Sequence, residues 1–217
     1  MKVKWLGHAA FLITSEEGVR IVTDPYKPGV YGLEYGAIKD EADIVTVSHE
    51  HDDHNYVAGV PGNPRVIRGA GSHQVNGIEF KGIACYHDES GGKERGDNTI
   101  FRFSVNGVRL CHLGDLGHKL TDEQVAAIGD VDVLMVPVGG SFTIDAAGAD
   151  GVIAQIKPAV AIPMHFKSDG CPNFPVCDSE PFLSGNKNVK RAGSAEVEFN
   201  RGQLPSPTQI ILLEHAL

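Results

Sequence analysis

The amino-acid sequence predicts a strand-rich α+β protein that forms one domain over residues 1–217. The first half of the chain consists mostly of short, β-branched apolar segments, which are typical of strands. The second half adds two segments that carry the start and stop signals of helices. No repeat, low-complexity tract or linker divides the chain, and a length of 217 residues suits a single domain.

The predicted strands are short apolar runs, most of them bounded by Gly, Pro, Asn or Asp. They occupy residues 2–6, 9–14, 19–23, 44–47, 65–68, 78–86, 99–105, 109–113, 131–138, 159–163, 196–199 and 209–214. Asn106-Gly107 is typical of a hairpin turn between two of them. Residues 26–40 are expected to form a loop, and residues 55–59 a short helical stretch that the Pro61 to Pro64 segment ends.

Two helices are predicted from their caps. Thr121 and Gln124 form a capping-box pattern that begins a helix, and Gly129 ends it near residue 128. Asp145 is expected to cap a second helix that runs to residue 156, before Pro158. Residues 166–188 are expected to form a long loop with one or two helical turns near residues 179–183.

The charge balance limits the classes of partner. A formal net charge of -9 provides no basic footprint, so nucleic acid is not expected as a partner and an anionic membrane would repel the chain. The first 18 residues are too polar for a signal peptide, and no apolar run approaches the ~20 residues of a spanning helix. We therefore expect a cytoplasmic protein, and the sequence leaves homo-oligomer formation open.

The most informative segment is IVTVSHEHDDH, residues 44–54. An apolar β-run ends there in five side chains that can bind metal. In an extended chain, His49 and His51 point to the same side and can reach one ion together. Asp53 and His54 follow as the chain turns, so they point elsewhere and can serve a second ion. This density of His and Asp after a strand is typical of a metal site.

Three further metal-binding side chains follow predicted strands. His87 follows residues 78–86, Asp115 follows residues 109–113, and His165 follows residues 159–163. Strands that end at one edge of a sheet bring such side chains together. We therefore expect these residues to converge on the His49–His54 turn.

The segments LGHAAFLI, DP, VSHEHDDH, LGDLGH, VPVGG and PMHF occur in this order. In this order they resemble the metallo-β-lactamase superfamily, and most closely the small metal-dependent hydrolases related to L-ascorbate-6-phosphate lactonase. The resemblance extends over nearly the whole chain. It implies a four-layer αβ/βα sandwich, in which two sheets pack face to face with helices outside, and the predicted strands and helices are compatible with that fold.

The resemblance also implies the ligands of two divalent metal ions. The first ion would be held by His49, His51 and His87, the second by Asp53, His54 and His165, and Asp115 would bridge the two. Such a set of imidazoles and carboxylates suits Zn²⁺ best here, and Mn²⁺ or Fe²⁺ are also accepted.

Two more residues match the family pattern. Asp24 would support the ligands, and His8 would be either a substrate or proton partner or a structural residue. Asp53, Asp115 and His8 are therefore the predicted catalytic residues.

The implied activity is hydrolysis of a small ester-type substrate, a lactone or a phosphoester, by a hydroxide shared between the two ions. An iron-dependent redox enzyme of the same fold is an alternative, although the di-iron branch has Glu where His51 stands. A non-catalytic metal-binding module is another alternative. The chain shows none of the extra segments that mark the ribonuclease and glyoxalase branches.

The remaining histidines receive other interpretations. His112 falls in strand alternation and is expected to be buried structure, whereas His118 is expected to face water rather than the site. His73 and His215 are expected on the surface.

Lys167 is the predicted substrate-binding residue. If the chain stays extended after His165, Lys167 points to the same side two residues later and places an ammonium beside the metals. The predicted partner is therefore a small anionic molecule.

Four cysteines complete the inventory. Cys85 and Cys111 lie in apolar runs and are expected to pack as small hydrophobic residues. Cys171 and Cys177 flank a Pro-rich loop, and the sequence leaves a disulfide between them open.

Overall fold

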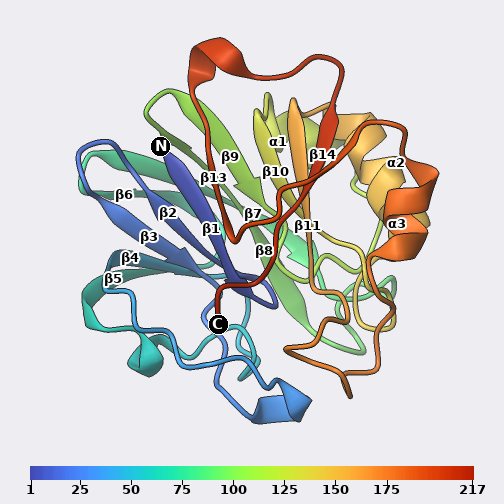
Figure 1. Ribbon diagram of the computed structural model, residues 1–217, viewed down its shortest axis with the longest axis horizontal. Helices are drawn as coiled ribbons and strands as arrows, with labels where there is room; N and C mark the ends of the chain where they lie inside the picture. The colour runs from blue at the N-terminus through green and yellow to red at the C-terminus, as the bar shows by residue number, and fades with distance from the viewer.

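The computed structural model describes residues 1–217, which form two mixed β-sheets packed face to face (Figure 1). The six-stranded sheet has the order β13 (Glu196–Glu198), β1 (Lys2–Gly7), β2 (Ala10–Thr14), β3 (Arg20–Thr23), β4 (Ala42–Val47) and β5 (Gly62–Arg68). β13, β1, β2 and β3 pair antiparallel, whereas β3, β4 and β5 pair parallel.

The eight-stranded sheet is also mixed. Its order is β12 (Val189–Arg191), β14 (Gln209–Leu212), β11 (Val160–Met164), β10 (Val133–Pro137), β9 (Val108–His112), β8 (Asp97–Val105), β7 (Ile78–Tyr86) and β6 (Gly71–Val75). The first five strands pair parallel, and β9 to β6 pair antiparallel.

Alternation along the six-stranded sheet separates two apolar layers. Val3, Trp5 and Phe11 belong to the large core that also contains the strands of the other sheet. Leu6 and Leu12 point the other way and pack in a smaller cluster with side chains from residues 26–38 and 171–176. Loops therefore form the outer layer on this side.

The helices α1 (Asp122–Ile128), α2 (Ala146–Ile156) and α3 (Glu180–Gly185) pack on the eight-stranded sheet. In Figure 1, α2 and α3 lie on the far side of this sheet from β1 to β5. The capping box of Thr121 and Gln124 is present, and the Asp145 side chain accepts from the backbone N–H of Gly148. Both predicted helix starts are therefore confirmed. None of the helices is long and apolar enough to span a membrane.

The predicted fold class is confirmed, but several local expectations were incomplete. β6 and β12 were not predicted, because the segments GSHQV and VKR carry few apolar side chains and lie at the edges of their sheet. The helical stretch ends before Pro61, as expected, but β5 begins at Gly62 rather than at residue 65, so Pro64 lies inside an edge strand, where a missing N–H is tolerated. The short turns are 3₁₀ segments at η1 (Val30–Gly32), η2 (Val57–Gly59) and η3 (Arg201–Gln203).

An ion pair fastens β9 to the segment before β10. Arg109 donates from Nη2 to Asp132 Oδ1 at 2.6 Å and from Nε to Oδ2 at 2.9 Å, and its backbone N–H also binds Oδ2 at 2.8 Å. The pairing with this guanidinium lowers the pKa of Asp132 below its usual value.

Strand direction decides where the polar ends meet. β1, β3 and β4 run in one direction within their sheet, and β7, β9 and β11 run in one direction within theirs. The carboxyl ends of these six strands therefore form one edge of the sandwich.

Candidate metal centre

Six strand ends supply the predicted site residues. His8 follows β1, Asp24 follows β3, the His49–His54 turn follows β4, His87 follows β7, Asp115 lies three residues after β9, and His165 follows β11. The convergence expected from the strand ends is confirmed, because these side chains lie in direct contact.

The candidate ligand atoms form two groups at the centre, and a third group of Asp24, His49 and His54 lies behind them; within each group all atoms lie within 4.8 Å of one another. One of the two central groups is His49, His51 and His87, and the other is His8, Asp53, His54 and His165. The HxHxDH turn thus divides between two groups, as its spacing predicted.

Asp115 lies between the two groups. Its Oδ2 is 3.1 Å from His87 Nε2, 3.2 Å from His54 Nε2 and 3.3 Å from His165 Nε2, and it is 3.9 Å from His49 Nε2. A single carboxylate oxygen therefore contacts both groups, which is the placement that a bridging ligand requires.

Buried atoms without partners show that this donor set suits metal ions. His49 Nε2, His54 Nε2, His165 Nε2 and Asp115 Oδ1 are buried and make no hydrogen bond. Such atoms are costly in a folded protein unless something satisfies them. Divalent ions coordinated by imidazole and carboxylate would satisfy all four.

Asp24 and Ser48 orient two of these histidines from behind. Asp24 accepts from the backbone N–H of Ser48 at 2.8 Å and from His54 Nδ1 at 3.0 Å, and it also accepts from Ser48 Oγ. Ser48 Oγ lies 2.9 Å from His49 Nδ1. Both imidazoles therefore turn Nε2 toward Asp115. The sequence suggested Asp24 but gave no signal for Ser48.

Asn98 holds the backbone of Asp115. Its Oδ1 accepts from the Asp115 N–H at 3.1 Å, and its Nδ2 donates to Leu113 O at 2.9 Å. The intervening Gly114 has φ 55, and a Cβ there would lie 2.4 Å from Asn98 Oδ1. Glycine before the aspartate is thus required both by the turn and by this close approach. Asn98 was not predicted from the sequence.

The backbone is strained at three of the strand ends. His8, Asp24 and His165 have φ values of 52, 39 and 53, in the left-handed region that non-glycine residues rarely adopt. Such strain is typical of functional sites, where surrounding contacts hold it. It turns these side chains toward the centre as soon as the strands end.

Burial and neighbouring charges set the protonation of the centre. Burial, followed by the charge of His54, lowers the pKa of His49 to about 3. Burial would raise the pKa of Asp115, but His165 and His54 outweigh it and hold the pKa well below the usual range. Burial would lower the pKa of His54, yet the carboxylates of Asp115 and Asp53 raise it well above the usual value. His54 must lose a proton to become a ligand, so metal binding should release one.

His8 lies beside the centre. Its Nε2 is 3.2 Å from Asp53 Oδ2, and burial together with the nearby His165 lowers its pKa to about 4. The Phe174 ring meets His8 edge-on at 5.3 Å and covers it. His8 is therefore a neutral neighbour of the Asp53 carboxylate, and its catalytic role stays a prediction.

The other histidines are held by the fold. His112 is fully buried, with Nε2 2.9 Å from Ala9 O and Nδ1 accepting from the Gly114 N–H, so the structural interpretation is confirmed. His118 is half-buried and accepts from the Tyr86 N–H, which places it neither at the centre nor free in water. His215 is also half-buried, against Trp5 and the exposed Asp169, so it lies only partly at the surface.

Lys167 does not line the metal cavity, contrary to the prediction. The prediction assumed an extended chain after His165, but His165 is left-handed and the chain turns there. Lys167 is exposed, and its backbone N–H binds Cys177 O. Cys171 is buried and Cys177 exposed, and both are free thiols, as are the buried Cys85 and Cys111.

A cavity of about 460 Å³ opens at the centre, a size suited to a small molecule. It is lined by His51, Asp53, His87, Asp115 and His165, together with Tyr31, Arg95, Phe142, Phe174 and Pro175. The second set was not predicted, because it comes from loops that sequence periodicity does not describe.

The geometry agrees with the comparisons to known proteins. The beta-lactamase superfamily domain matches residues 2–165. The chain belongs to the metallo-β-lactamase superfamily. Within it, the chain falls in the UPF0173 family of metal-dependent hydrolases, and it combines that fold with a buried His/Asp metal-site cluster. The further resemblance to ascorbate-6-phosphate lactonase is not part of what these comparisons show.

Individual relatives support this assignment. A UPF0173 metal-dependent hydrolase of Carboxydothermus hydrogenoformans is 30% identical over 194 residues, which cover 77% of this chain and 85% of that protein. The crystal structure of a proposed Zn-dependent hydrolase of the superfamily from Thermotoga maritima is 37% identical, covers 99% of both chains and has a TM-score of 0.81. The di-iron β-hydroxylase CmlA of Streptomyces venezuelae, at 12% identity over 85% of this chain and 50% of its own, with a TM-score of 0.58, shares the fold alone.

Proposed function

We propose that this protein hydrolyses a small ester-type substrate, a lactone or a phosphoester, with two divalent metal ions. The observation that carries the proposal is the position of Asp115 Oδ2, within 3.3 Å of imidazole nitrogens from both ligand groups. The lactone class is supported by the sequence resemblance to lactonase-related hydrolases.

The residues divide into three roles. His49, His51 and His87 would hold one ion, Asp53, His54 and His165 the other, and Asp115 both. When bound, ions in such sites activate a water molecule as nucleophile and polarise the oxygen of the scissile carbonyl or phosphoryl group. Zn²⁺ is the proposed ion, and Mn²⁺ or Fe²⁺ would suit the same donors.

The protein's own groups prepare the site. Asp24 and Ser48 fix the rings of His54 and His49 so that each presents Nε2. His8 keeps its proton on one ring nitrogen near neutral pH and donates from Nε2 to Asp53, which orients that carboxylate. Phe174 packs edge-on against His8 and His165 and excludes water from that side.

The test combines metal analysis with turnover. Protein purified without chelator and reconstituted with Zn²⁺ should hold two equivalents and hydrolyse members of a panel of lactones and phosphodiesters. The His49→Ala/His51→Ala double variant should lose the first equivalent and the activity. One equivalent or fewer after reconstitution, or turnover that survives chelation, would contradict the proposal. Oxygen consumption by an iron-loaded sample would instead favour the redox alternative.

A further inference from the structure

Arg95 contributes the single Lys or Arg side chain among the residues that line the metal cavity. The chain has a net charge of -9, and the cavity also contains the carboxylates of Asp53 and Asp115. The guanidinium at this position is therefore opposite in charge to its surroundings. Metal ligands account for the carboxylates, but nothing in the metal chemistry requires a guanidinium.

The loop that carries Arg95 is organised around the buried Asp88 carboxylate. Asp88 Oδ1 accepts from the backbone N–H groups of Ser90 and Gly92 at 2.8 and 2.9 Å, and Oδ2 accepts from those of Glu94 and Arg95 at 3.0 and 2.8 Å. Four backbone hydrogen bonds to one carboxylate fix residues 88–95. The backbone that carries the Arg95 side chain is thus held in place.

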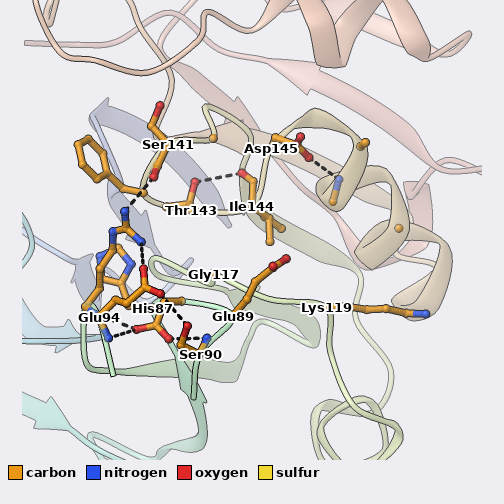
Figure 2. A pocket seen from close by; sticks show the side chains of 17 residues that line it. His87, Glu89, Ser90, Glu94, Gly117, Lys119, Ser141, Thr143, Ile144 and Asp145 are labelled. Carbon is orange, nitrogen blue, oxygen red and sulfur yellow. Dashed lines mark hydrogen bonds and ion pairs between the residues drawn. The ribbon is translucent and has the colours of Figure 1, made fainter. Parts of the chain in front are cut away.

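Three contacts hold the Arg95 guanidinium, and they leave most of its N–H donors free. Its Nη2 donates to Ser141 O at 3.3 Å, Nη1 lies 3.6 Å from Glu94 Oε2, and the group stacks 5.7 Å from the centre of the Phe142 ring. Figure 2 shows Ser141 and Glu94 on opposite sides of the neighbouring cavity, which is about 680 Å³. A guanidinium has five N–H donors, so most of them remain available to a ligand.

The remaining side chains at the mouth of the metal cavity are aromatic or apolar. Phe142, Phe174 and Pro175 line it, and Tyr31 stands 60% exposed at its opening with φ 49. An aromatic mouth with one forked cation suits a molecule that has an apolar or planar body and one oxyanion.

We propose that Arg95 binds an anionic group of the substrate, a carboxylate or phosphate away from the scissile bond, and so determines specificity. The inference rests on the proposed hydrolytic function of the same site. Asp88 acts as a positioning residue, because it holds the loop rather than the ligand. This assigns to Arg95 the role that the sequence suggested for Lys167.

The direct test compares esters that differ only in a remote group. The substrates are 4-acetoxybenzoate, 4-acetoxyphenylphosphonate and the neutral isostere 4-acetoxybenzamide, assayed with the Zn-loaded protein. The wild type should prefer the anionic esters, and Arg95→Gln should lower the anion-to-amide ratio of kcat/KM by about 10- to 100-fold, the size expected for a hydrogen bond to a charged group. The change should lie mainly in KM, and Arg95→Lys should restore part of it. The carboxylate and phosphonate arms show which oxyanion is preferred.

Lys167→Gln is the matched control, since it removes one exposed cation from outside the cavity. It should leave the ratio unchanged. An unchanged ratio in Arg95→Gln, or a loss of preference in Lys167→Gln instead, would overturn the assignment.

A binding measurement separates this inference from the proposed function. Dicarboxylates from malonate to adipate are titrated against their monocarboxylate counterparts, without any hydrolysis. A dicarboxylate advantage that Arg95→Gln abolishes supports the inference even if no ester is turned over. Ester turnover without anion preference, or dicarboxylates that bind no better than monocarboxylates, would refute Arg95 as an anion site while leaving hydrolysis intact.

Discussion

Replacing Asp24 by Asn should weaken both metal sites through the protonation of two histidines. The Asp24 carboxylate can only accept, so the proton of Ser48 Oγ points to Asp24. Ser48 Oγ must then accept from His49 Nδ1, and Asp24 accepts from His54 Nδ1. When metal binds, both rings would therefore keep the proton on Nδ1 and offer the Nε2 lone pair to the ion.

In Asp24→Asn the side-chain oxygen keeps the backbone N–H of Ser48, which leaves the amide NH₂ facing Ser48 Oγ and His54 Nδ1. Both atoms must now accept, and Ser48 Oγ turns its proton toward His49 Nδ1. All hydrogen bonds survive, so the fold should persist. Both histidines, however, then carry the proton on Nε2, the atom that should coordinate the metal ion.

The magnitude follows from the loss of such outer partners, which typically reduces metal affinity by about 10- to 100-fold, or roughly 1.4–2.7 kcal/mol. Because His49 also groups with His51 and His87, and His54 with Asp53 and His165, each of the two proposed sites should lose that much. Chelator competition with Zn²⁺ measures the two affinities. Ser48→Ala should affect only the His49 group, since His54 keeps its bond to Asp24.

Asp122→Asn, an exposed carboxylate at the start of α1, is the control and should bind metal as the wild type does. Wild-type affinity at both sites in a folded Asp24→Asn protein would refute the tautomer argument. Equal weakening of both sites by Ser48→Ala would also contradict it.

Three further outcomes are expected. Asp115→Asn should lower ester turnover by at least about 100-fold, because the amide lacks the charge that would offset two cations; near wild-type kcat would assign the bridge elsewhere. Asp132→Asn should lower the free energy of unfolding by about 1 kcal/mol at pH 7, since its arginine partner is partly exposed. The folded-state pKa of Asp132 is depressed, so this difference should persist above about pH 4 and vanish as urea titrations move to lower pH. Gly117→Ala places a Cβ 2.3 Å from the His87 carbonyl carbon and should destabilise by about 1–3 kcal/mol in thermal unfolding, whereas Gly151→Ala in α2 meets no atom within 4 Å and should stabilise by up to about 1 kcal/mol.

The sequence predicted those parts of the fold that depend on local pattern. The apolar run at residues 2–6 predicted the strand that forms β1, and the caps Thr121 and Asp145 marked the helix starts. The polar edge strands β6 and β12 lacked such a pattern, because their pairing comes from the neighbouring strand rather than from their own side chains.

At the candidate metal centre, the residues at strand ends could be predicted from the sequence, but the residues that orient them through hydrogen bonds could not. The convergence of side chains at strand ends follows from the direction of the strands, which is why His87, Asp115 and His165 could be predicted to lie together. Ser48 and Asn98 act through hydrogen bonds to segments 24 and 17 residues away. A single Ser or Asn in a sequence does not indicate which distant backbone group it binds.

The sequence predicted Lys167 as the substrate-binding residue, whereas the structure supports Arg95. One backbone angle accounts for the difference. Two residues after a ligand, an extended chain would return a side chain to the same face, and Lys167 satisfied that rule. His165 instead adopts φ 53, so the rule fails at the one residue where the chain turns into the centre. Arg95 reaches the cavity because Asp88 folds residues 88–95 back on themselves, a contact visible only in three dimensions. The proposed metal-binding side chains are positioned by strand ends, whereas the position of the proposed substrate-binding side chain depends on how the loops between the strands close.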